Sequence, residues 1–126
     1  AEDFKNSCVI ADDIDVLTNK KQRTACLAIV NEILELGRHF NTTLIQTSHL
    51  TTAGHDSRRI LNEAHYITYF PHSGSVSGIK RLLLQYCGLS NTDLAEAKST
   101  GSRWITIAKN FPIVMFGEKH CWEPKN

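Results

Sequence analysis

Apolar and polar residues alternate along the chain in blocks that predict strands and helices in turn. A continuous apolar run at residues 8–11 predicts a strand buried on both faces, as in a parallel sheet. Residues 18–40 have the spacing of an amphipathic helix that Thr18 caps, with Gly37 near its end in the left-handed conformation common there. The apolar face of this helix comprises Leu27, Val30, Ile33 and Leu34.

The blocks that follow predict further strands and helices. They are a strand at 43–47, a short helix capped by Asp56 or Ser57, a strand at 65–70, helices at 79–86 and 90–99, and strands at 104–108 and 113–116. Ser90 opens the last of these helices, and the final two strands read as a hairpin. This order predicts an α/β fold with a mainly parallel sheet, flanked by helices and ending in a C-terminal hairpin.

Length and composition indicate the size of the domain and the classes of partner that the chain could have. A chain of 126 residues is about one small domain, and its 41% apolar content is enough for a core. The net charge of +1 indicates no broad surface for nucleic acid or membrane, and leaves a local basic surface open. Widely spaced cysteines without a CxxC pair predict reduced thiols in a reducing compartment, and no membrane span is visible. The abrupt start, without Met, leads us to expect a fragment.

Two adjacent acids, Asp12 and Asp13, end the first apolar strand. Ligands of open α/β sheets lie beyond the carboxyl ends of the strands. A hydrophobic strand that ends in two acids has the form of a Walker B element, in which Asp12 would hold Mg²⁺ through water and Asp13 would orient or deprotonate an attacking water. The alternative is a strand followed by an Asp-rich turn and a helix cap.

Other polar residues offer partners for these acids. Gln46 could position a water if its strand lies beside the Asp12-Asp13 strand, or it is a satisfied polar group at a strand end. Arg38, Arg58 and Arg59 could each reach a neighbouring subunit's phosphates, or they cap a helix end or cover a solvated helix face.

Several other chemistries lack their motifs. His49 and His55 have no Cys or His at a convincing spacing for a metal site. Neither the GxSxG nucleophile elbow nor the GxxxxGK[ST] phosphate loop occurs in the chain.

Four segments together resemble one family: SCVIADDID, LELGRHFNTTLIQTSH, SRRILNEAHYITYFP and SRWITIAKNFPIVMF. The family is the poxvirus-type genome-packaging ATPase of large double-stranded DNA viruses, in the FtsK/HerA superfamily of P-loop motors. The resemblance covers nearly all of this chain and only the later half of the family's domain. It implies that residues 1–126 are the C-terminal part of one RecA-like, ASCE-type P-loop ATPase domain, from the Walker B strand onward.

The resemblance also implies roles for individual residues. Asp12 would be the acid associated with Mg²⁺ and Asp13 the catalytic acid. Gln46 matches the sensor, with Ser48 and His49 as alternatives if the match slips by one or two positions. Arg59 is favoured as the arginine that acts across the subunit boundary, and Arg58 and Arg38 are further candidates.

Members of this family use ATP and Mg²⁺. They are similar in forming rings that move double-stranded DNA into a capsid, which implies capsid or portal-vertex proteins as partners. The implied location is the host cytoplasm, at the viral factory, with the virion as a second place.

In such folds the phosphate-loop strand lies beside the sensor strand, and here it would be missing. The sensor strand would then have an unpaired edge, and the isolated chain is expected to be inactive. Two alternatives remain open. One is a HerA-like cellular or conjugative DNA translocase, and the other is a degenerate, non-catalytic assembly module.

Overall fold

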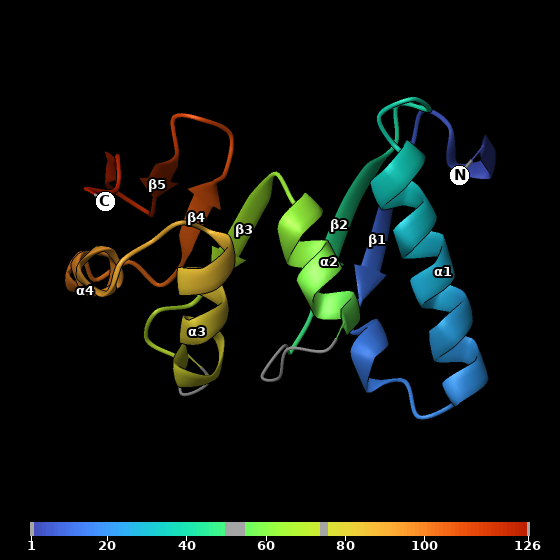
Figure 1. Cartoon of the computed structure of the whole chain (residues 1–126), viewed down its shortest axis with the longest axis horizontal. Helices are drawn as coiled ribbons and strands as arrows, with labels where there is room; N and C mark the ends of the chain where they lie inside the picture. Colours follow the sequence, from blue (N-terminus) through green and yellow to red (C-terminus); the bar gives the residue numbers. More distant parts are fainter. Residues whose placement is uncertain (1, 50–54, 74–75, 126) are drawn as a thin grey trace. The chain divides into compact units, whose positions relative to one another are not determined.

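The computed structural model describes residues 2–49, 55–73 and 76–125, without the side chains of residues 55–58 and 76–77. The chain divides into two compact units, unit 1 at Ala1–His49 and unit 2 at Leu50–Asn126. Figure 1 shows the elements of each unit. Each unit has its own sheet and is described by itself.

Unit 1 is a strand–helix–strand unit. Its elements are η1 (Glu2–Phe4), β1 (Cys8–Asp12), η2 (Ile14–Val16), α1 (Lys20–Leu36) and β2 (Thr43–Thr47). The strands β1 and β2 pair in parallel, with Cys8 opposite Thr43 and Asp12 opposite Thr47. Parallel strands need a crossover connection, and α1 provides it. The predicted strand at residues 43–47 is confirmed.

The ends of α1 differ from the prediction. Asn19 caps the helix instead of Thr18, because its side-chain oxygen accepts hydrogen bonds from the amides of Lys21 and Gln22. The helix ends at Leu36 and not at residue 40, and a turn follows. Gly37 is right-handed, with φ at −57°. A Cβ at Gly37 would lie 2.5 Å from the carbonyl oxygen of Ile33, so close packing explains this glycine and the predicted left-handed conformation does not.

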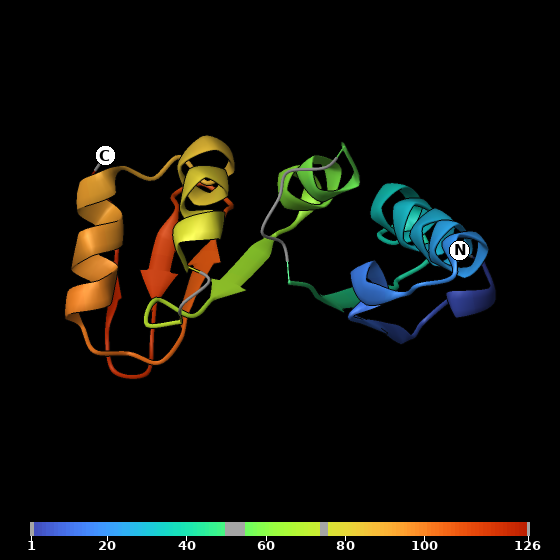
Figure 2. The ribbon, with the colours of Figure 1, turned by 90° about the horizontal axis from the view of Figure 1, so that it is seen from below.

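One face of the β1/β2 pair carries α1, and Figure 2 shows the helix on one side of the two strands. Val30 and Ile33 of α1 are buried and form the core of this unit together with Ala11. The opposite face is open: Ile10 and Ile45 are cross-strand partners, yet they are 67% and 51% exposed. The prediction that residues 8–11 are buried on both faces is therefore wrong.

The described residues of unit 2 form an antiparallel sheet and three helices. Its elements are α2 (His55–Glu63), β3 (Tyr66–Tyr69), α3 (Val76–Tyr86), α4 (Asn91–Ser99), β4 (Ile105–Ala108), β5 (Val114–Phe116) and β6 (Cys121–Trp122). The sheet order is β3-β4-β5-β6 and every neighbouring pair is antiparallel. The predicted C-terminal hairpin is confirmed as β4 and β5. The fold is thus mixed α/β, and the expected mainly parallel sheet is found only at β1 and β2.

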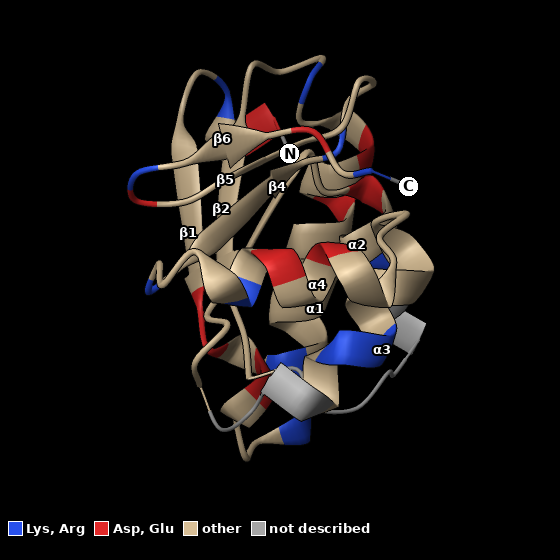
Figure 3. Ribbon diagram, turned by 90° about the vertical axis from the view of Figure 1, so that its left-hand side faces the viewer, with Lys and Arg blue, Asp and Glu red and all other residues tan. Residues whose placement is uncertain are grey.

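The core of unit 2 lies between its sheet and two helices. Ile105, Ile107 and Met115 of the sheet are fully buried against residues of α3 and α4, including Leu83 and Ala97. In Figure 3 these helices lie on one side of the sheet. Burial of this kind contributes about 25 cal/mol for each Å² of apolar surface removed from water.

The start of α4 is fixed by a reciprocal cap. Ser90 accepts a hydrogen bond from the amide of Asp93, and the carboxylate of Asp93 accepts from the amide and hydroxyl of Ser90. Asp93 is fully buried and also accepts a hydrogen bond from the amide of Lys125. The predicted opening of this helix by Ser90 is confirmed.

Two global features complete the fold. All four cysteines are free thiols, with Cys87 buried and Cys8 and Cys121 exposed. Among the residues that the structure describes, no helix is long and apolar enough to cross a membrane.

Candidate functional site

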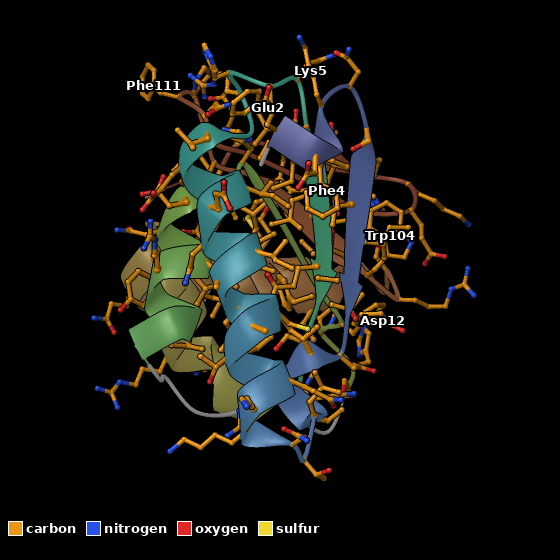
Figure 4. All side chains as sticks on the ribbon, turned by 90° about the vertical axis from the view of Figure 1, so that its right-hand side faces the viewer. Glu2, Phe4, Lys5, Asp12, Trp104 and Phe111 are labelled. Atoms are coloured by element: carbon orange, nitrogen blue, oxygen red, sulfur yellow. The ribbon has the colours of Figure 1, made fainter. Side chains whose placement is uncertain are left out.

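The carboxyl ends of β1 and β2 meet at one edge of the parallel pair. The last pair in register is Asp12 and Thr47, so the acids after β1 lie beside residues 47–49 at the end of β2. Figure 4 shows Asp12 at the end of β1, away from Glu2 and Lys5 at the other end. The adjacency of the two strands, on which the sequence interpretation depends, is present.

Asp12 is held by the hydroxyl of Thr47. Thr47 Oγ1 donates a hydrogen bond to Asp12 Oδ1 and accepts one from the backbone amide of Asp13, at 3.1 Å. One hydroxyl therefore contacts both acidic residues. No other hydrogen bond to the Asp12 carboxylate is present within the described residues, which leaves Oδ2 available to water or a cation.

Asp13 turns the chain out of the strand. Its φ of 51° and ψ of 39° are left-handed, a conformation that Asp adopts more readily than most residues. Asp13 Oδ1 lies 3.3 Å from His49 Nε2, with the two side chains 38% and 73% exposed. A pair this exposed adds at most about 1 kcal/mol to stability, so it matters chiefly for orientation.

A third acid, Asp15, binds the same end of β2. Its Oδ2 accepts hydrogen bonds from Ser48 Oγ at 2.9 Å and from the amide of His49 at 3.1 Å. Asp12, Asp13 and Asp15 thus hold three successive residues, 47 to 49. Sequence reasoning missed Asp15, and it placed Thr47 in the polar cluster at the end of the second strand without giving it a role. The available signal was a third acid two residues after Asp13, together with the polar Thr-Ser-His sequence at the end of the next strand.

Gln46 lies on the other face of the strand pair. It is paired with Ala11 and alternates with Thr47, so it shares the α1 side with Leu44 while Asp12 and Thr47 share the open side. Its Oε1 is buried and has no hydrogen-bond partner among the described residues. The acids and Gln46 reach the same end of the sheet, but Thr47 and His49 are the residues in contact with the acids. Ser48, an alternative to Gln46 and a candidate for binding the nucleotide, donates a hydrogen bond to Asp15.

The candidate arginines belong to other elements than the acids do. Arg38 follows α1 and precedes β2, so the length of β2, about 16 Å for five residues, separates it from the acids. Arg58 and Arg59 lie in α2 of unit 2, where Arg59 is half-buried and the Arg58 side chain is outside the described part. None of the three is brought to the acids within unit 1.

The acids suit magnesium better than a metal that needs several protein ligands. No group of three or more His, Cys, Asp or Glu suited to hold a metal occurs in residues 2–49, 55–73 and 76–125. Mg²⁺ keeps several waters and is commonly held by one or two carboxylates together with substrate phosphates. Asp12 and Asp13 are the two carboxylates at this edge that could serve in this way.

Unit 2 has a separate groove between α3 and α4, with a volume of about 260 Å³. Its lining residues are Tyr69, Pro71, Lys80, Leu83, Asn91, Leu94, Ala95 and Lys98. The Tyr69 hydroxyl is buried and has no hydrogen-bond partner among the described residues. Basic residues on α3, blue in Figure 3, include Lys80 and Arg81. Two basic residues are too few to define a DNA-binding surface. None of the predicted site residues lines the groove.

Comparison with known proteins finds a viral protein that is similar to this chain in sequence. The chain is 44% identical over 119 residues to a protein of Sputnik virophage named "Uncharacterized protein V3". The match covers 92% of this chain and 48% of the relative, so the chain spans about half of the relative's length. No protein-family profile and no solved structure matches the chain.

Proposed function

We propose that this chain is the later part of a RecA-like P-loop ATPase that packages double-stranded viral DNA into a capsid. The observation that carries the proposal is the contact between the two acids at the end of β1 and the end of the adjacent parallel strand β2. The proposal is further supported by the resemblance to the poxvirus-type packaging ATPases. A relative encoded by a virophage fits a viral protein.

Each acid has a distinct role in this proposal. Asp12 holds Mg²⁺ through water, with its carboxylate oriented by the Thr47 hydroxyl. Bound Mg²⁺ supplies positive charge that neutralises the phosphoryl oxygens of ATP. Asp13 accepts a proton from, or orients, the attacking water, which needs a carboxylate fixed within hydrogen-bond reach.

Two residues of β2, on opposite faces of the strand pair, are candidates for the sensor. Gln46 was assigned to it from sequence, and its buried, unpaired Oε1 leaves an acceptor for a donor that enters from beside β2. Thr47 is the β2 residue already in contact with Asp12 and Asp13. We therefore propose Thr47, in addition to Gln46, as a sensor residue that contacts the bound nucleotide.

The phosphate loop must come from outside this chain. Within the described residues β2 pairs only with β1, so its other edge has no strand partner. Such an edge readily accepts another strand. We propose that the phosphate-loop strand pairs there and brings the loop amides and lysine to the acids, so the 126 residues alone do not hydrolyse ATP.

The remaining partners follow from the motor class. Arg59 acts on the nucleotide of a neighbouring subunit in a ring, with Arg58 and Arg38 as the other candidates. A role in trans suits Arg38, because it lies at the end of β2 opposite the acids of its own unit. Double-stranded DNA and capsid or portal-vertex proteins are the partners, in the host cytoplasm at the viral factory and in the virion.

Two other functions remain as alternatives. A HerA-like cellular or conjugative translocase would use the same site, and the virophage relative favours the viral function. A non-catalytic assembly module is favoured by the open β2 edge and the exposed Ile10 and Ile45, which suit docking of another segment.

The test is magnesium-dependent ATP hydrolysis by the complete protein that contains this chain. We expect Asp13→Asn to lower kcat by roughly 100-fold or more while ATP still binds, because the water loses its orienting carboxylate. The control is Asp3→Asn, an exposed acid of η1 at the other end of unit 1, which keeps full activity. Unchanged turnover in Asp13→Asn would remove Asp13 from the mechanism.

A further inference from the structure

The contact between His49 and Asp13 gives residues at the end of β2 a role that the proposed ATPase reaction does not yet include. We infer that His49 is a positioning residue that fixes the Asp13 carboxylate, and that Asp15 fixes His49. The inference rests on the proposed function and adds two residues to it. Neither residue is expected to touch the nucleotide.

Asp13 needs such a support because little else holds its carboxylate. The residue follows the end of β1 in a left-handed conformation, and its side chain is 38% exposed. Its backbone amide is bonded to Thr47, but among the described residues the carboxylate contacts only His49 Nε2, at 3.3 Å. Without that contact the two side-chain torsions of Asp13 would be free to rotate. A base that samples several rotamers orients water in only a fraction of them.

His49 in turn depends on Asp15. Its imidazole is 73% exposed, so packing does not set its direction. Its backbone is held, because Asp15 Oδ2 accepts hydrogen bonds from the His49 amide and the Ser48 hydroxyl. Asp15 belongs to η2, which is anchored by the buried side chain of Ile14. The buried Ile14 thus fixes Asp15, Asp15 fixes the backbone of His49, and His49 fixes the Asp13 carboxylate.

The support is specific to one of the two acids. Asp12 is held by the Thr47 hydroxyl, and no hydrogen bond joins Asp12 to His49 in the described part of unit 1. Changes at His49 should therefore affect the orientation of water and leave the magnesium-associated acid in place. In kinetic terms this lowers kcat and leaves the KM for ATP unchanged.

The experiment compares His49→Leu, His49→Gln and Asp15→Ala in the complete protein. Leu fills a similar space without a donor, and we expect kcat to fall about tenfold at unchanged KM, as for loss of a residue that orients a ligand. Gln presents an amide N–H near the place of Nε2 and should restore kcat to within about threefold of wild type. The control is His39→Leu, an exposed histidine before β2, which should not change kcat.

The double variant separates positioning from general damage. Since Asp15 acts through His49, His49→Leu/Asp15→Ala should lose no more activity than His49→Leu alone. Wild-type kcat in His49→Leu, or a raised KM at unchanged kcat, would overturn the positioning role while the ATPase function stands. Absence of any turnover in the complete protein would overturn the proposed function and this role together. A separate measurement does not depend on turnover. The ¹⁵N signals of the His49 imidazole should differ between the wild type and Asp13→Ala, and the absence of a difference would refute the contact itself.

Discussion

Thr47→Val removes one hydroxyl from the end of β2 and tests the network around the acids. Valine has nearly the shape of threonine and an equal or better preference for strands. The variant loses two hydrogen bonds, one donated to Asp12 Oδ1 and one accepted from the Asp13 amide. The strand itself should persist, so any effect reports on the hydroxyl.

The magnitude follows from the number and exposure of these bonds. A hydrogen bond contributes about 0.5–1.5 kcal/mol net, and water competes at this exposed position. Two bonds in the lower part of that range give about 1–2 kcal/mol. Since 1.4 kcal/mol is a factor of ten, the β2 amides should exchange with solvent roughly 5 to 30 times faster.

Hydrogen exchange is the suitable assay because unit 1 contains no tryptophan, and both tryptophans of the chain lie in unit 2. The matched control is Thr43→Val, on the same open face of β2, whose hydroxyl makes no hydrogen bond within the described residues. The control removes the effect of strand preference from the comparison. Equal exchange rates in the two variants would refute the assignment of Thr47 as the link between the strands' ends.

Further predictions concern unit 2, followed by tryptophan fluorescence during urea unfolding. Asp93→Ala should lower the free energy of unfolding by about 2–4 kcal/mol, because three hydrogen bonds to its buried carboxylate are lost, while the exposed Thr92→Ala should have little effect. Burial raises the pKa of Tyr69 to about 12 and the pKa of Cys87 to about 11. Between pH 9 and 12 the unfolded chain therefore binds fewer protons than the folded one, and stability should fall as pH rises, by up to about 1.4 kcal/mol per pH unit for each group. Tyr69→Phe should flatten the fall above pH 10, and an equal slope in the variant would contradict the tyrosine's part in it.

Local signals in the sequence predicted individual elements well. The strand at 43–47 and the Ser90 cap follow from short-range chemistry, because the Asn-Thr turn before the strand and a Ser-x-x-Asp pattern act within a few residues. The pairing of β3 with β4 could not be predicted in this way. It joins Tyr66 to Ala108, and no local pattern states which distant strand a segment will meet.

The site was predicted at the level of strands and only in part at the level of side chains. The tandem acids at a strand end followed from the sequence, and the adjacency of β1 and β2, which the interpretation required, is present. The resemblance placed the sensor at Gln46, with Ser48 and His49 as alternatives, but the register places Gln46 on the α1 face and Thr47 beside Asp12. A single-residue shift along a strand exchanges its faces, and sequence alone does not fix it.

The exposure of β1 has a similar cause. An apolar run such as residues 8–11 shows that burial is favourable, but not which neighbours provide it. Among residues 2–49, α1 covers one face of the β1/β2 pair and leaves Ile10 and Ile45 on the other face exposed. Under the proposed function these side chains and the open edge of β2 mark where the rest of the ATPase domain packs.

The most direct test of the central claim is to place a paramagnetic ion at the site. With Mn²⁺ in place of Mg²⁺ and a non-hydrolysable ATP analogue, NMR of the complete protein should show strong broadening of the Asp12, Asp13 and Thr47 amides, with residues at the other end of β1 much less affected. Broadening centred elsewhere, or none that depends on the nucleotide, would contradict the claim that the ends of β1 and β2 hold the magnesium nucleotide.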